Sequence, residues 1–153
     1  MSEMSSRDTH LRRLGLGLAA GTVLAAIVAT QWPFHYQLTR FAIHHHWARI
    51  DWRWLPRTGT GHVRDERDLV LNLLMLIPLG IGFALWRRAS GARVVFEALL
   101  LGIVTSTTLE LAQLATAYRH TTLADVWCNA IGCMAGAIMV VALRRAATVS
   151  GSL

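Results

Sequence analysis

The sequence contains no lysine, so all 15 of its basic residues are arginine. Against 9 acidic residues, they give a formal net charge of +6. Much of the arginine flanks long apolar runs, and this placement favours an anionic membrane surface over nucleic acid as the partner. No RNA- or DNA-binding motif occurs in the sequence. We therefore expect membrane lipids, and no nucleic acid, among the partners.

Cysteine is scarce, because only Cys128 and Cys133 are present, five positions apart in one apolar run. On a helix they point in different directions, so we expect two buried free thiols and no disulfide. Histidine is absent from every run long enough to span a membrane, which argues against a haem-carrying bundle. G-x-S-x-G, H-E-x-x-H and P-loop motifs are also missing. We expect no cofactor.

One histidine run is present, at His44, His45 and His46. Consecutive imidazoles on a helix point in different directions, and no acid or cysteine stands nearby at ligand spacing. A solvated or headgroup-facing run is therefore expected here, and no metal site.

Apolar residues are abundant, at 54% of the chain. They concentrate in four runs, at 14–32, 69–86, 94–117 and 125–143. Each is close to the roughly 20 helical residues that cross the hydrocarbon of a bilayer. The fold class expected is all-α, a polytopic membrane protein with a bundle of four transmembrane helices. The first run is long for a signal peptide, and no clean cleavage site follows it, so we expect it to be retained.

The chain is short enough for one domain, which we place at 14–145 between tails at 1–13 and 146–153. The segment 34–68 joins the first two spans and is the least regular part of the sequence. Its aromatic residues are typical of the headgroup region, and 37–47 is expected to form an amphipathic interfacial helix.

Proline and glycine mark two further features of the spans. Pro78, in the middle of the second run, predicts a kinked helix. The pairs Gly17 with Gly21 and Gly132 with Gly136 each form a small-xxx-small face that lets another helix approach closely. Such faces offer a route to a homo-oligomer.

Arginine pairs or triplets stand directly beside three helix ends, at the N-terminus, in the 87–93 loop and at the C-terminus. The positive-inside rule therefore places these three parts in the cytoplasm. The segment 34–68 is then extracytoplasmic. Its several arginines weaken the rule, and its acidic residues count little in it.

Costly polar side chains recur in the last three apolar runs and in the short loop between the last two. With a rise of ~1.5 Å per residue, those inside the helices all lie in the outer part of the bilayer. Such groups in a membrane face a protein interior or a watery cavity and mark functional sites. The expected ligand-binding residues are Asn72, Glu110, Gln113, Arg119, Asp125 and Asn129.

Helical spacing sharpens this expectation. Ser106, Glu110 and Gln113 follow one another at i, i+4 and i+7, so they share one face of the third helix. Asp125 and Asn129 are four apart and share a face of the fourth helix. Catalytic roles stay open, with Glu110, Asp125 and the loop residue His120 as acid/base candidates.

Each polar residue also has a structural alternative. Asn72, Ser106 and Asn129 can join helices by hydrogen bonds worth on average about 0.6 kcal/mol per pair. Glu110 needs a partner such as Arg119, or else it stays protonated.

The loop residues have alternatives of the same kind. Thr122-Leu-Ala-Asp125 is a plausible capping box for the fourth helix, in which Asp125 is no more than a cap. Arg119 can simply neutralise Glu110 and Asp125. Glu97 is expected to pair with Arg93 at the cytoplasmic end of the third helix.

Three stretches resemble the VanZ-like family of small bacterial membrane proteins. They are D-L-V-L-N-L-L-M-L-I-P-L-G at 68–80, S-T-T-L-E-L-A-Q-L at 106–114 and R-H-T-T-L-A-D-V-W-C-N-A-I-G-C-M-A-G at 119–136. The matching positions are Asp68, Asn72, Pro78, Gly80, Ser106, Glu110, Gln113, Arg119, Asp125, Asn129, Gly132 and Gly136. The founding member is associated with resistance to teicoplanin, a glycopeptide whose lipid tail lodges in the outer leaflet. The resemblance implies this context and a bacterial cytoplasmic membrane, but no reaction.

Together these observations predict an envelope protein with a polar pocket in the outer leaflet. Its ligand would be an amphiphile with a charged head, such as a phospholipid, a lipid-linked cell-wall precursor or a lipoglycopeptide. One alternative is an enzyme that acts on a lipid-linked substrate. Another is a structural or partner-binding bundle, in which the polar groups only join helices. A proton-coupled transporter is a third alternative.

Overall fold

The computed structural model describes residues 2–36, 38–48, 50, 52, 66–87, 91–116 and 122–150. This part of the chain is helical and contains no strand, only an isolated bridge between Tyr36 and Thr116. Four helical segments are long and apolar enough to cross a membrane, which confirms the expected fold class. The helices are α1 Ser2–Gln31, α2 Arg40–Trp47, α3 Glu66–Met75, α4 Ile77–Trp86, α5 Ala92–Gln113 and α6 Leu123–Ser150.

The first and last helices, α1 and α6, are longer than the sequence predicted. The polar stretch expected as an N-terminal tail already belongs to α1, and α6 continues past Arg144 and Arg145 to Ser150. No glycine or proline interrupts either extension. Once a helix is formed, each added residue gains a backbone hydrogen bond without a new nucleation step. Polar residues can therefore prolong both helices beyond the apolar runs, into the segments expected as tails.

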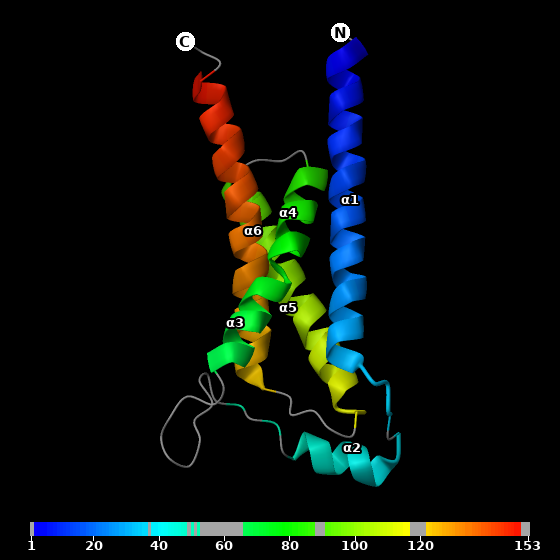
Figure 1. Ribbon diagram of the computed structural model, residues 1–153. Helices are drawn as coiled ribbons and strands as arrows, with labels where there is room; N and C mark the ends of the chain where they lie inside the picture. Colours follow the sequence, from blue (N-terminus) through cyan, green and yellow to red (C-terminus); the bar gives the residue numbers. More distant parts are fainter. Residues whose placement is uncertain are drawn as a thin grey trace.

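The second span is broken, as Pro78 predicted. α3 ends at Met75 and α4 begins at Ile77, with Leu76 as the N-cap residue between them. Pro78 falls in the first turn of α4, where its missing N–H removes no hydrogen bond that the helix needs. Figure 1 shows α3 and α4 running in different directions within one span.

The spatial order of the helices differs from their order in the chain. α6 packs against α5, α4 and α3, and α1 packs mainly against α4. The N- and C-termini lie at one end of the bundle, whereas α2 lies across the opposite end (Figure 1). This position of α2 agrees with the interfacial helix expected at 37–47.

Glycine permits the closest helix contacts. A Cβ atom on Gly132 would overlap the carbonyl oxygen of Leu73, and one on Gly136 would overlap that of Ile77. The predicted small-xxx-small face of α6 is thus used inside the chain, against α3 and α4. The other predicted face, at Gly17, has no neighbouring atom within 4 Å of a Cβ placed there.

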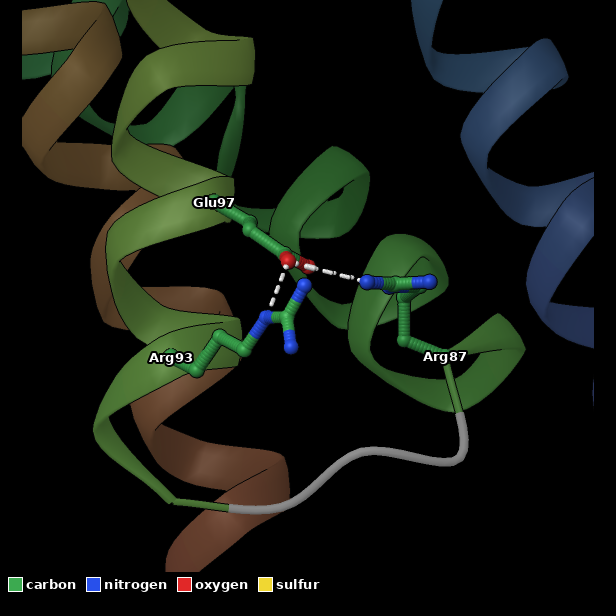
Figure 2. Close-up of polar contacts among 3 residues, drawn as sticks. All are labelled: Arg87, Arg93 and Glu97. Atoms are coloured by element: carbon green, nitrogen blue, oxygen red, sulfur yellow. Dashed lines mark hydrogen bonds and ion pairs between the residues drawn. The ribbon is translucent and has the colours of Figure 1, made fainter.

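At the end of the bundle that carries the termini, Glu97 joins α4 to α5. Its carboxylate accepts two hydrogen bonds of 2.9 Å from Arg87 and one of 3.0 Å from Arg93, as Figure 2 shows. The bond to Arg93 was predicted, and the bidentate bond to Arg87 was not. The hydrogen bond to Glu97 and its negative charge raise the pKa of the Arg87 guanidinium.

Candidate functional site

The buried face of α5 supplies three of the predicted polar residues. Ser106, Glu110 and Gln113 are buried, with 0%, 6% and 5% of their surfaces exposed. Leu109, also buried, completes a stripe at positions i, i+3, i+4 and i+7. The shared face that the spacing predicted is therefore present, and it faces protein rather than lipid.

Asn129 of α6 meets this stripe directly. Its Nδ2 atom donates a hydrogen bond of 2.9 Å to Oγ of Ser106. Asn129 is 2% exposed, and its Oδ1 atom has no hydrogen-bond partner among the residues that the structure describes. A buried amide oxygen that lacks a partner is costly, so its hydrogen-bonding capacity needs an explanation.

Asn72 and Asp125 form a second contact between spans. Nδ2 of Asn72 donates to Oδ1 of Asp125, across α3 and α6. Oδ2 of Asp125 accepts a bond of 2.7 Å from the hydroxyl of Thr122, whose Oγ1 in turn accepts from the backbone N–H of Asp125 at 3.2 Å. The last of these bonds is the N-cap contact of the predicted capping box.

Gln31, in the last turn of α1, was not predicted as a site residue. It is only 3% exposed, and its Nε2 atom donates to the carbonyl oxygen of Leu109 at 3.3 Å and to Oγ1 of Thr30 at 3.3 Å. Within the described part of the chain, its Oε1 atom has no hydrogen-bond partner. The available signal was an amide at the end of an apolar run, at the same end of the bundle as Gln113.

These side chains gather at one end of the bundle, the end opposite the termini. The C-terminal ends of α1 and α5 and the N-terminal ends of α3 and α6 meet there (Figure 1). We refer to the group as the polar layer. Its described members are Gln31, Asn72, Ser106, Glu110, Gln113, Asp125 and Asn129.

Two predicted residues, Arg119 and His120, lie outside the described residues. Of the histidine run, His44 and His45 are exposed, and the ring of His45 stacks on Phe41 with 6.3 Å between centroids. The described residues include no group of three or more His, Cys, Asp or Glu side chains placed to hold a metal ion.

Chemically, the polar layer offers hydrogen-bond acceptors close to a buried carboxyl group. The hydrogen bonds donated by the side-chain amides of Gln31 and Asn129 both end on the α5 stripe, at Leu109 and Ser106, on the same helix face as Glu110. In Gln31, the bond from Nε2 to a backbone carbonyl fixes the amide orientation, so Oε1 is an acceptor in need of a donor. The arrangement suits a bound group that carries O–H or N–H donors.

The sequence matches the family model described as VanZ/LLP1 over residues 16–144. That range includes the part of α1 from residue 16 onward and the connection to α3, which carry none of the motif residues quoted above. No curated protein and no solved structure matches the chain. The family match covers most of the sequence and agrees with the motifs in the second, third and fourth spans. The chain therefore belongs to the VanZ/LLP1 family.

Proposed function

We propose that the polar layer binds the charged head group of an envelope amphiphile whose tail lies in the outer leaflet. One observation carries the proposal. The buried Glu110 lies on the α5 face with Ser106 and Leu109, which accept hydrogen bonds from the amides of Asn129 and Gln31. Both of these amides are buried, and their oxygens have no hydrogen-bond partner among the described residues. Polar groups inside a membrane are costly and are retained where they meet a substrate or ligand. A head group with donor atoms would satisfy both oxygens.

The proposed roles follow from the chemistry of each side chain. Arg119 would hold an anionic part of the head group with its forked donors. Glu110 would orient the head group or exchange a proton with it, and Gln113 and Asn129 would supply hydrogen bonds. Asn72 and Asp125 already bond each other, so we place them in the wall of the site.

The family is linked to glycopeptide resistance. A lipid-linked cell-wall precursor, a phospholipid and a lipoglycopeptide all combine an acyl tail with a polar head, so all three fit the proposal. The membrane would be the bacterial cytoplasmic membrane, with both termini in the cytoplasm by the positive-inside rule. This orientation would place the polar layer in the outer leaflet.

Binding is favoured over catalysis by the contacts of Asp125. Both of its carboxylate oxygens accept hydrogen bonds, from Asn72 and Thr122. These two bonds hold the carboxylate in one orientation. That suits a fixed acceptor better than a group that must give and take protons.

The test compares Glu110→Gln and Arg119→Ala with wild-type protein. Glu97→Gln is the matched control, because it removes a carboxylate from the other end of the same helix. Lipids that co-purify with each variant are measured by mass spectrometry, and sensitivity to teicoplanin and related envelope antibiotics is measured in cells. Loss of a hydrogen bond to a charged group should weaken retention about ten- to hundred-fold for the site variants only. Equal retention and sensitivity at equal expression would refute the proposal.

A further inference from the structure

A second feature of interest lies at the opposite end of the bundle. There, α5 and α6 border an apolar groove of about 640 Å³. Phe96 and Leu99 form part of the α5 wall, and Ile138 and Val141 form part of the α6 wall. Both helices are candidate membrane spans, so the groove opens at the depth of lipid acyl chains. Its volume lies within the range of about 300–1,000 Å³ that is common for small-molecule sites.

The mouth of the groove is cationic. The lining runs along α6 from Met134 to Arg145, a rise of roughly 16 Å. Arg145 stands at the end of the groove that is nearest the termini. There, a nitrogen of its guanidinium lies 3.8 Å from the position that a Cβ on Gly91 would take. Gly91 caps α5, whose N-terminal end adds the positive pole of a helix dipole. The groove thus passes from hydrocarbon walls to a positive charge.

The nearby charges leave this positive end uncompensated. Glu97 is engaged by Arg87 and Arg93 (Figure 2). Arg144 donates to the carbonyl oxygens of Arg87 and Leu85. In the described part of the chain, no acidic side chain pairs with Arg145. The mouth of the groove therefore lacks a counter-ion from these helices.

We propose that this groove binds an anionic phospholipid from the leaflet on the side of the termini. One acyl chain would lie between α5 and α6, and the phosphate would contact Arg145. An apolar channel that ends in a cation matches a molecule that joins a hydrocarbon chain to an anion. Basic pockets between membrane helices bind anionic head groups in this way. The site lies at the other end of the bundle from the polar layer and does not depend on the function proposed above.

The test measures lipid selectivity of the full-length protein in phosphatidylcholine vesicles. Spin-labelled phosphatidylglycerol and spin-labelled phosphatidylcholine are added separately, and the motionally restricted fraction of each is measured by electron paramagnetic resonance. Wild-type protein should prefer phosphatidylglycerol, and the preference should fall as salt screens the charges. Arg145→Gln should lower the relative association of phosphatidylglycerol about five-fold, whereas Arg145→Lys should retain it.

Two further variants separate this site from general charge and from loss of structure. Arg12→Gln removes an exposed arginine on α1, outside the groove, and should leave the preference unchanged. Ala142→Phe fills the groove and should reduce phosphatidylglycerol restriction while the unfolding temperature stays near that of wild type. Equal restriction of both lipids by wild-type protein would overturn the proposal. Equal losses of the phosphatidylglycerol preference in Arg12→Gln and Arg145→Gln would overturn it as well. The proposal would also fail if Ile138→Cys formed disulfide-linked dimers that exclude the lipid from the groove.

Discussion

Nδ2 of Asn72 lies 2.5 Å from Oδ1 of Asp125, so one hydrogen bond joins α3 to the first turn of α6. Fifty-three positions separate the two residues in the chain. The contact places the second and fourth spans in register at the level of the polar layer. It also helps to hold the side chain of Asp125, which accepts a second hydrogen bond from Thr122 in the capping box of α6.

Breaking this contact should reveal a measurable coupling between the two spans. Asn72→Ala, Asp125→Ala and the double variant are compared by the free energy of unfolding in mixed detergent. Hydrogen bonds between membrane helices couple residues by about 0.6 kcal/mol on average and up to about 1.7 kcal/mol. We expect a coupling in this range. As a control, the effects of Asn72→Ala and Glu97→Gln on the free energy of unfolding should add, because these residues lie at opposite ends of the bundle. Full additivity of Asn72→Ala and Asp125→Ala would mean that the bond between them does not form.

The start of α6 depends on the hydroxyl of Thr122. This group accepts from the N–H of Asp125 and donates to its carboxylate. Thr122→Ala removes both bonds and should cost about 0.5–2 kcal/mol of stability, as for other N-caps. Thr122→Ser keeps the hydroxyl and should lie close to wild type. Thermal unfolding followed by circular dichroism distinguishes the two, and identical melting temperatures for both variants would contradict the capping role.

The two glycine faces should respond differently to a single methyl group. Gly136→Ala places a Cβ against the carbonyl oxygen of Ile77, which belongs to a helix backbone and cannot rotate away. The cost of such overpacking is typically about 1–3 kcal/mol. Gly17→Ala meets no neighbour within 4 Å and should cost little. Unfolding in detergent measures both variants. If the Gly17 face instead joins two copies of the chain, its variant will lower the dimer fraction in crosslinking without lowering monomer stability.

The sequence contained enough information to predict the spans and much of the arrangement of the polar layer. Hydropathy alone located the four membrane segments, because burial in lipid imposes a strong constraint on composition. Pro78 marked the break in the second span. Helical spacing placed Ser106, Glu110 and Gln113 on one buried face, since that depends only on the period of the helix.

Contacts between helices were harder to predict, because they depend on which spans become neighbours. The chain order does not reveal that α1 packs on α4, a contact in which Gly15 approaches Gly82. The bond from Gln31 to Leu109 joins residues 78 positions apart. An amide at the end of an apolar run is also typical of the membrane surface, so Gln31 gave no sign of its burial.

The bundle makes a clear prediction about the sides of the membrane. Both termini lie at one end and α2 lies at the other (Figure 1). If the termini are cytoplasmic, a cysteine at His44, exposed on α2, should react with a membrane-impermeant maleimide added outside intact cells. The protein used for this experiment carries Cys128→Ser and Cys133→Ala in place of its native cysteines. Cys133 is replaced by the apolar alanine because its side chain is fully buried.

A cysteine at Arg93 supplies the matched control. Arg93 is exposed but stands at the termini end of α5, so it should react only after the cells are permeabilised. Fluorescent-protein fusions at the C-terminus should report the cytoplasm in the same cells. Reaction of the Arg93→Cys variant in intact cells, with protection of His44→Cys, would invert the topology. The polar layer would then face the cytoplasm, and ligands confined to the outer leaflet would be excluded.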